Sequence, residues 1–372
     1  MIKVPFVDLV TWLRPSREEY LAAFANVIDT GTFIGGPQVG EFEAAFARYT
    51  GAPHAVAVKT GTDALLLGLR ALGVGPGDEV ITAANSFFAT AEAISHAGAV
   101  PVLADVDDQT LLIDVADVKR RITKKTRCII PVHLFGQIGD LPAILDLGLK
   151  VIEDSAQAHG ATRGRGVGTM RAGSIADLAA FSFYPTKNLG ALGEGGAITA
   201  RDPQIAERVR SLRDHGQAGR HDHAVIGYNA RLDSLQCACL SITLQRLDGA
   251  NAARRKLAAR YREQLANVAG VQLVAEAPDS SPVYHLMIVR VAAPRRDAIR
   301  DALSKAGIAT AIHYPTPIHL QRAYAHLGQG PGSCPIAERA AQEMISLPMF
   351  PDLTVEQVDH VAMSLAAALR AG

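Results

Sequence analysis

The sequence predicts an α/β protein with a mainly parallel, seven-stranded sheet flanked by helices and a smaller C-terminal α+β domain. Seven short, nearly all-apolar runs alternate with helical segments as far as residue 200. This alternation is typical of a sheet that is covered on both faces. With 372 residues, 48% of them hydrophobic, the chain can also bury a large core.

The N-terminal part of the chain reads as two amphipathic helices within residues 15–51. Glycine-rich residues between Gly31 and Gly36 separate them. Ser16 and Glu19 have the spacing of a capping box at the start of the first helix.

The seven strand candidates define one edge of the sheet, because ligands of such sheets bind beyond the carboxyl ends of the strands. The runs are HAVAV, EVITAA, VPVLADV, CIIPVHLFG, KVIED, LAAFSFY and GGAITA. The residues where these strands stop are Gly61, Thr62, Ser86, Phe87, His133, Asp154 and the turn from Ser182 to Lys187.

The C-terminal part is predicted to form the smaller domain. A long helix is expected from Leu235 through residues 254–262, and we place the boundary near Gly249, which gives domains of 1–249 and 250–372. Beyond it we expect strands at 284–291 and 308–315 and helices at 295–307, 335–346 and 354–370.

The charge balance and the lack of long apolar runs argue against nucleic acid and membranes as partners. Lys plus Arg equals Asp plus Glu, 37 of each, so neither nucleic acid nor an anionic membrane surface is expected. No apolar run is long enough to span a bilayer and the start MIKVPFVDL lacks an apolar signal core, so the expected location is cytoplasmic.

No metal site is expected. The cysteines lack zinc-site spacing and read as buried thiols. A polar loop holds several potential ligands without any further ligand signature; they are His215, His221, His223, Asp214 and Asp222.

Three of the strand-end features suit a ring-shaped, phosphorylated ligand. Gly61 and Thr62 open a helix directly after a strand, which suits a phosphate, although a simple helix cap would look the same. Asp154 follows buried apolar residues and needs a partner such as a protonated ring nitrogen, unless it caps the next turn. Phe87 could stack on the ring or pack in the core.

Lys187 is the candidate nucleophile. It lies in FSFYPTKNLGALGEGG, residues 181–196, where a β-prone run meets a glycine-dense segment. A desolvated lysine amine has a lowered pKa and can form a Schiff base with an aldehyde. The alternative for a single lysine is a solvated loop position.

Five spaced motifs together resemble the sugar aminotransferases of the DegT/DnrJ/EryC1/StrS family over nearly the whole chain. They are TGTDAL (60–65), EDSAQAHGA (153–161), FSFYPTKNLGALGEGG, GYNARLDSLQ (227–236) and HYPTPIH (313–319). The resemblance implies the type I fold of pyridoxal 5'-phosphate enzymes, with Lys187 as the Schiff-base lysine and Asp154 as the acid on the pyridine nitrogen.

The resemblance also implies the remaining site residues. Gln157 and Phe87 match positions at the cofactor ring, and Gly61, Thr62 and Ser182 match phosphate-binding positions. Asn229 is expected to reach the phosphate of the neighbouring subunit, so that a homodimer shares its active sites. The candidates for contact with the nucleotide-sugar are Tyr184, Arg220, His313 and Tyr314.

The chain departs from the family pattern at Lys59 and Thr60, where relatives often have a small residue and serine. This places a cation near the expected phosphate site. The family also has dehydratase-like members with histidine in place of the lysine, and Lys187 argues against that branch.

The activity that the resemblance implies is transfer of an amino group from L-glutamate to a nucleotide-linked keto-deoxysugar. The stretches HYPTPIHLQRAY and ISLPMFPDLT are most similar to enzymes that aminate C3 of a dTDP-3-keto-6-deoxyhexose. Amination at C4 and a non-catalytic regulator that binds the cofactor are the alternatives. A nicotinamide-dependent oxidoreductase is disfavoured because no G-x-G-x-x-G turn follows the first strand.

Overall fold

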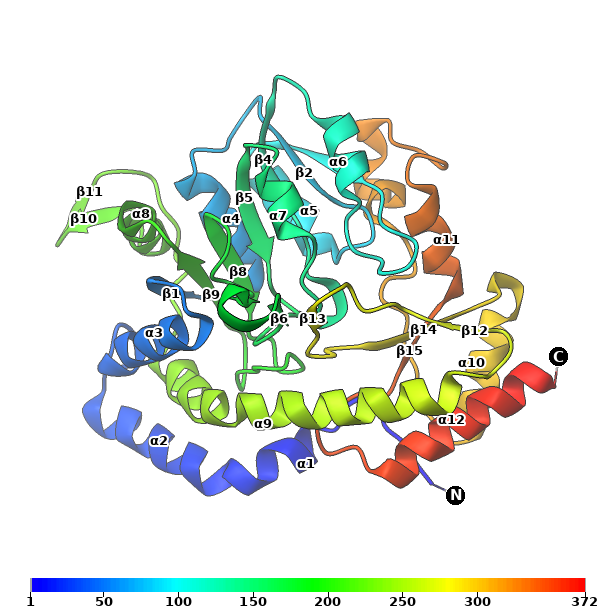
Figure 1. The fold of residues 1–372 in the computed structure, drawn as a ribbon. Helices are drawn as coiled ribbons and strands as arrows, with labels where there is room; N and C mark the ends of the chain where they lie inside the picture. Colours follow the sequence, from blue (N-terminus) through cyan, green and yellow to red (C-terminus); the bar gives the residue numbers. More distant parts are fainter. Residues whose placement is uncertain (1, 372) are drawn as a thin grey trace.

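The computed structural model describes residues 2–371, and a seven-stranded sheet forms its centre (Figure 1). The strand order is β1-β9-β8-β5-β4-β2-β3. Strand β9 runs antiparallel to both of its neighbours, whereas the other pairs are parallel, which confirms the predicted mainly parallel sheet. The strands are β1 His54–Val58, β2 Glu79–Ala83, β3 Val100–Ala104, β4 Thr126–Ile130, β5 Lys150–Asp154, β8 Leu178–Ser182 and β9 Gly196–Ala200.

Helices cover both faces of this sheet because its strands are buried on both sides. One face packs against three helices, α4 Gly61–Ala71, α5 Phe88–His96 and α8 Pro203–Arg213. The opposite face packs against α3 Pro37–Thr50 and the long helix α9 Ser234–Leu265 at one end. Two shorter helices, α6 Val115–Arg121 and α7 Leu141–Leu145, complete the cover.

The N-terminal helices agree with the prediction except at their first cap. The predicted pair is α2 Arg17–Thr30 and α3, preceded by the short helix α1 Leu9–Leu13. Gly31 ends α2 in the left-handed conformation, φ 65°. The predicted capping box is wrong: Ser16 is the N-cap residue but its side chain makes no cap bond. Arg246 of α9 donates instead to both Ser16 and Glu19.

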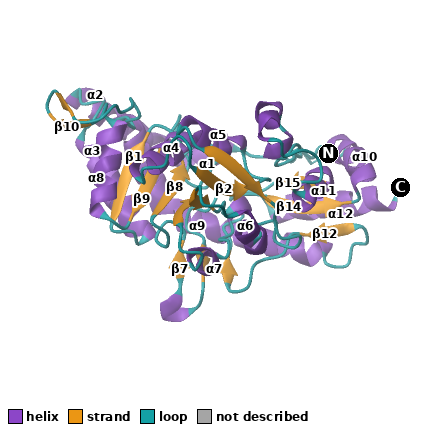
Figure 2. Ribbon diagram, turned by 90° about the horizontal axis from the view of Figure 1, so that it is seen from above, coloured by secondary structure: helices purple, strands orange, loops and turns teal. Residues whose placement is uncertain are grey.

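A second, three-stranded sheet follows α9, in the order β12-β14-β15. Figure 2 shows it beside the large sheet, with two of its helices near the C-terminus. The elements are β12 Val271–Leu273, β14 Met287–Val291, β15 Met344–Leu347, α10 Arg296–Lys305, α11 Pro335–Glu343 and α12 Val355–Arg370.

Two predicted elements of this region differ from the structure. Residues 308–315 form isolated bridges rather than a strand, because Ile308 pairs with Val4 and Ala311 with Ser346. The helix predicted at 335–346 stops at Glu343, where β15 begins and pairs with β14.

Helix α9 runs without a break through residue 249, so the proposed domain boundary lies inside a helix and stays a prediction.

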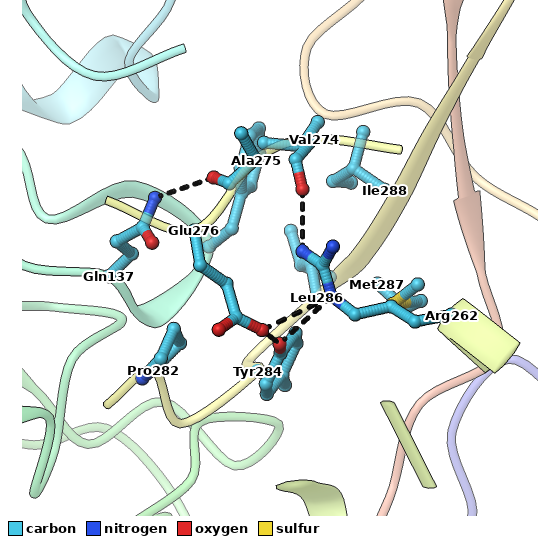
Figure 3. A pocket seen from close by; sticks show the side chains of 11 residues that line it. Gln137, Arg262, Val274, Ala275, Glu276, Pro282, Tyr284, Leu286, Met287 and Ile288 are labelled. Carbon is cyan, nitrogen blue, oxygen red and sulfur yellow. Dashed lines mark hydrogen bonds and ion pairs between the residues drawn. The ribbon is translucent and has the colours of Figure 1, made fainter. Parts of the chain in front are cut away.

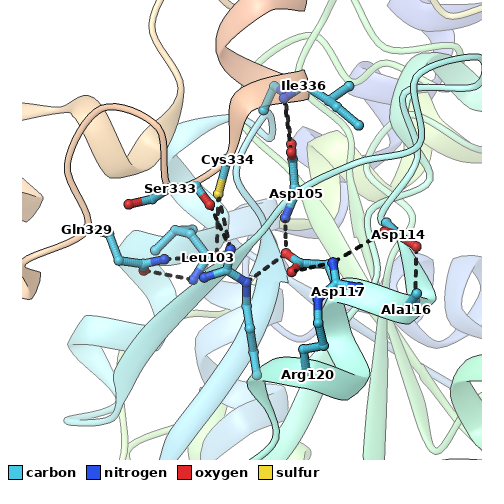
Figure 4. A network of polar contacts seen from close by, with 12 residues as sticks. Leu103, Asp105, Asp114, Ala116, Asp117, Arg120, Gln329, Ser333, Cys334 and Ile336 are labelled. Atoms are coloured by element: carbon cyan, nitrogen blue, oxygen red, sulfur yellow. Dashed lines mark hydrogen bonds and ion pairs between the residues drawn. The ribbon is translucent and has the colours of Figure 1, made fainter.

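The segment around α11 is tied to the edge of the large sheet (Figure 4). Asp105 accepts hydrogen bonds from the amides of Ile336 and Ala337 at the start of α11, at 2.9 and 2.8 Å. The side-chain amide of Gln329 donates to and accepts from the main chain of Leu103, at 3.0 and 3.1 Å. These bonds cover the exposed edge of β3.

Short elements complete the chain. Hairpin β10 Gln217–Gly219 and β11 Asp222–His223 projects from the body (Figure 1). A small sheet joins β6 Thr162–Arg163, β7 Met170–Arg171 and β13 Ser280–Ser281. The four cysteines are free and buried, as predicted. Within residues 2–371 no helix has the length and apolarity needed to cross a bilayer.

Candidate active site

The carboxyl ends of β1 and β8 meet the amino end of β9 in a very close main-chain approach. A Cβ atom on Gly61 would lie 2.6 Å from the Cβ atom of Ser182. A Cβ atom on Gly196 would lie 2.4 Å from the carbonyl oxygen of Thr60. Only glycine fits at these two positions, which brings the first turn of α4 next to the Ser182 side chain.

This turn has free donors for an anion. Thr60 caps α4, and its hydroxyl accepts from the amide of Asp63 at 3.0 Å. The amides of Gly61 and Thr62 have no partner inside the helix because they belong to its first turn. Together with the Ser182 hydroxyl and the positive end of the helix dipole, they form a cradle that suits a phosphate.

Asp154 ends β5 and is only 4% exposed. Its Oδ2 accepts a 2.8 Å hydrogen bond from Thr90 of α5, and its Oδ1 accepts from the amide of Ala156 at 3.2 Å. Burial raises the pKa of Asp154, and these hydrogen bonds with the charge of Lys187 oppose the rise. A buried carboxylate that carries a negative charge is stabilised by a cationic partner, such as a protonated ring nitrogen.

Lys187 follows β8 and is partly buried. Its amide donates to the carbonyl of Tyr184 at 2.8 Å, which closes the turn that carries the amine. Burial lowers the pKa of Lys187 to about 8, and the nearby Asp154 charge limits the decrease. A neutral fraction of this amine is therefore present near neutral pH, as a nucleophile or a proton acceptor requires.

Three residues surround the space in front of Asp154. Gln157 is buried, accepts from the Phe135 amide at 2.7 Å and donates to the Tyr314 hydroxyl at 3.3 Å. Phe87 caps α5 with 55% of its surface exposed, and its ring lies 5.4 Å from the Tyr314 ring. An exposed aromatic ring next to a tyrosine suits a flat ligand better than a core role.

His313, next to Tyr314 in the chain, contacts the N-terminal segment. Its Nδ1 lies 2.8 Å from the Ser346 hydroxyl, and its ring stacks on Phe6 at 5.7 Å. Burial, followed by the charge of Lys187, lowers the pKa of His313 to about 4, so the ring is neutral. The N-terminal segment thus forms part of the site, which the sequence did not indicate.

Three expected site residues lie on exposed parts of the chain. Tyr184 is exposed within the turn that precedes Lys187, and Arg220 is exposed at the β10–β11 hairpin. Asn229 is exposed, and its Oδ1 accepts from Arg231 at 2.9 Å. Among the hydrogen bonds of the described chain, none joins Arg220 or Asn229 to the Lys187 and Asp154 cluster.

Within the described residues, no hydrogen bond joins Lys59, or the loop with His215, His221 and His223, to Lys187 or Asp154. The side chain of Lys59 is exposed, and its amide donates to the Ala230 carbonyl at 2.8 Å. Over residues 2–371, no group of three or more His, Cys, Asp or Glu side chains is placed to hold a metal ion.

Sequence reasoning missed the residues that orient the cluster from other elements. Thr90 lies on α5, one turn after its N-cap Phe87, and contacts both Asp154 and Ser86. The helical spacing from Phe87 to Thr90 was the available signal, because residues three apart lie on one face of a helix.

The described residues fit pyridoxal 5'-phosphate. The cradle at Gly61, Thr62 and Ser182 would hold the phosphate, Asp154 the ring nitrogen and Lys187 the aldehyde, while Phe87 and Gln157 would flank the ring. When bound, this cofactor supplies an electron sink and carries an amino group between two substrates.

The chain is similar to known sugar aminotransferases over nearly its whole length. A dTDP-3-amino-3,4,6-trideoxy-alpha-D-glucose transaminase of Streptomyces venezuelae is 46% identical over 364 residues, 96% of this chain and 94% of the relative. A dTDP-3-amino-3,6-dideoxy-alpha-D-galactopyranose transaminase of Aneurinibacillus thermoaerophilus is 43% identical over 362 residues, 96% of this chain and 97% of the relative.

The solved structure of S. venezuelae DesV in complex with a ketimine intermediate superposes with a TM-score of 0.95 at 44% identity, covering 99% of each chain. The family model for DegT/DnrJ/EryC1/StrS aminotransferases matches residues 15–366. The protein uses pyridoxal phosphate, and the chain belongs to the DegT/DnrJ/EryC1/StrS aminotransferase family.

Proposed function

We propose that this aminotransferase moves an amino group from L-glutamate to C3 of a dTDP-3-keto-6-deoxyhexose. The observation that carries the chemistry is the pair of Lys187, with a lowered pKa, and the buried Asp154 beside a glycine cradle for phosphate. The acceptor is proposed from the two relatives, whose names both describe dTDP-3-amino sugars.

The residues of the chain divide the work. Asp154 holds a positive charge on the ring nitrogen, because a buried carboxylate with few partners favours that charge. The neutral amine of Lys187 takes the α-proton of the amino donor and returns a proton in the reverse half-reaction. Gly61, Thr62 and Ser182 fix the phosphate so that the reacting carbon stays within reach of Lys187.

The nucleotide-sugar is proposed to contact Tyr184, Arg220, His313 and Tyr314. Tyr314 contacts Gln157 and Phe87, His313 packs edge-on against Tyr314, and Tyr184 is exposed in the Lys187 turn. Arg220 is an exposed cation at the β10–β11 hairpin, and a guanidinium suits a pyrophosphate.

A homodimer with shared active sites is part of the proposal, with Asn229 reaching the phosphate of the partner. Its support is that Asn229 is exposed and already held by Arg231. Co-expression of Lys187→Ala and Asn229→Ala subunits tests it, because a hybrid dimer then holds one site with both residues intact. Recovery of activity supports sharing, whereas no recovery in isolated hybrids contradicts it. A cytoplasmic location and the division at residue 249 stay predictions.

The acceptor is tested with a panel of keto-sugars. The enzyme is first loaded with the amino group from L-glutamate and then mixed with 3-keto and 4-keto deoxyhexoses linked to dTDP or UDP. Amination of the dTDP-linked 3-keto sugar with the highest kcat/KM supports the proposal. Preference for a 4-keto sugar replaces the C3 assignment by C4. Absence of any amination with a fully loaded enzyme shows that the acceptor lies outside this panel, whereas an enzyme that binds the cofactor but takes no amino group from L-glutamate favours a regulator or another donor.

A further inference from the structure

The side chain next to the reactive lysine is held by a hydrogen-bond network that no part of the proposed reaction uses. Asn188 is 3% exposed. Its Nδ2 donates to Oδ1 of Asn251 on α9 and to the carbonyl of Val283, both at 2.9 Å. Its Oδ1 lies 3.2 Å from Nδ1 of His285.

These contacts determine which groups carry hydrogens. A side-chain amide has two N–H donors, and both donors of Asn188 are used. Its oxygen must therefore accept from His285, which places the imidazole proton on Nδ1. The opposite orientation of the Asn188 amide would set its oxygen against two oxygen acceptors. Asn251 is fixed in turn, because its Nδ2 donates to the carbonyl of His159 at 2.8 Å.

The segment that supplies Val283 and His285 is strained and clamped. Tyr284 has φ 44°, a left-handed conformation that an aromatic residue adopts only when its surroundings impose it. Its carbonyl accepts from Arg254 at 3.3 Å. Its hydroxyl donates to Glu276 and accepts from Arg262, as Figure 3 shows.

Arg254 also ties this segment to Met349, just after β15. Arg254 is 5% exposed, and the same Nη1 atom also donates to the Met349 carbonyl at 3.0 Å. Lys187, Asn188 and Arg254 line one small cavity beside the N-terminal segment. The lysine turn is thus joined to α9 and to the segment that leads into β14.

The charges around His285 agree with the neutral form. Burial lowers the pKa of His285 well below its ordinary value, and the neighbouring Lys187 and Arg254 charges, with His313 and His159, lower it further. A neutral ring with the proton on Nδ1 is the form that the Asn188 oxygen requires.

We propose that Asn188 and His285 are positioning residues for Lys187. They fix the main chain at 187–188 against the segment 283–285, and so keep the amine in its partly buried place during both half-reactions. Neither residue needs to touch the substrate. The inference rests on the aminotransferase activity, but not on which sugar is the acceptor.

The test compares two substitutions of the same histidine in the enzyme supplied with pyridoxal phosphate. His285→Asn keeps an N–H where Nδ1–H lies, whereas His285→Gln moves the amide to the position of Nε2. Asn188→Ala removes the network. Gln329→Ala is the matched control, because it removes two hydrogen bonds at the edge of β3, away from Lys187.

We expect His285→Gln and Asn188→Ala to slow the glutamate half-reaction at least about tenfold while the KM for glutamate changes less than about threefold. They should also shift the pH midpoint of the visible absorption band of the enzyme with bound pyridoxal phosphate by about half a pH unit or more. His285→Asn and Gln329→Ala should remain close to wild type in both measurements.

The absorption titration needs neither donor nor acceptor, so it decides the question even where L-glutamate proves to be the wrong donor. An unshifted midpoint in His285→Gln and Asn188→Ala overturns the proposal. The proposal is also overturned if the glutamate half-reaction slows as much in His285→Asn as in His285→Gln, because a purely structural role does not distinguish the two amide positions.

Discussion

Thr90 Oγ1 donates a 2.8 Å hydrogen bond to Oδ2 of Asp154 and is itself 2.7 Å from the Ser86 hydroxyl. Asp154 lies at the end of β5, and Thr90 lies on the helix that follows β2, so the bond orients the acid from a strand connection two places away in the sheet. With Oδ1 held by the amide of Ala156, both oxygens of the carboxylate are oriented, and their remaining acceptor positions are left for a ligand.

We predict graded losses when this arrangement is changed. Asp154→Asn removes the negative charge and should slow the glutamate half-reaction by about a hundredfold or more, because the ring nitrogen loses its counter-charge. Thr90→Val removes only the orienting bond and should cost about tenfold. Single-turnover kinetics measure both. A Thr90→Val rate at or below that of Asp154→Asn would contradict the positioning role of Thr90.

The phosphate cradle predicts a steric effect at Gly61. Gly61→Ala places a Cβ atom 2.6 Å from the Cβ atom of Ser182, so the first turn of α4 must shift. We expect the affinity for pyridoxal phosphate to fall about tenfold or more, measured by equilibrium dialysis. Gly249→Ala on α9 is the control, because nothing lies within 4 Å of the added atom. Equal affinities in the two variants would show that the cradle is not the phosphate site.

The lowered pKa of Lys187 predicts a pH-dependent effect on the cofactor-free protein. The amine has a pKa of about 8 when folded and 10.5 ordinarily, so the unfolded chain binds more protons between these values. The cost of the buried ammonium is therefore greatest below pH 8 and disappears as the pH rises toward 10.5. Lys187→Met should stabilise the apoprotein at pH 7 by about 2 kcal/mol, with a smaller gain at pH 10.

Urea unfolding of the two apoproteins at both pH values measures this difference. A gain that grows with pH has the wrong sign and would exclude burial as the cause of the lowered pKa. Asp154 provides an internal check, because Lys187→Met also removes an attractive charge from Asp154 and should raise its pKa further.

Most of the large sheet could be predicted because each strand is a short apolar run with a turn or helix on either side. The strand predicted at 308–315 was wrong for a tertiary reason: β14 pairs with Met344–Leu347 instead. That run continues an apparent helical pattern from α11, and periodicity alone does not separate a short apolar strand from the end of a buried helix.

Candidate site residues could be named where a residue ends a strand, as for Asp154 and Ser182, or lies in the turn that follows, as for Lys187. They could not be named where the contact depends on how distant elements pack. Asn188 lies 63 residues from Asn251 and 97 from His285, and no local pattern indicates that they meet. Phe6 reaches His313 only because the N-terminal segment pairs with the second half of the chain.

The most direct test of the account is the visible absorption spectrum of the enzyme supplied with pyridoxal phosphate, recorded before and after addition of L-glutamate. We predict a band that arises from the cofactor bound through Lys187 and that glutamate replaces by the band of the aminated cofactor, with neither event in Lys187→Ala. Formation of the same glutamate-sensitive band in Lys187→Ala, or no band in the wild-type enzyme, would contradict the role assigned to Lys187.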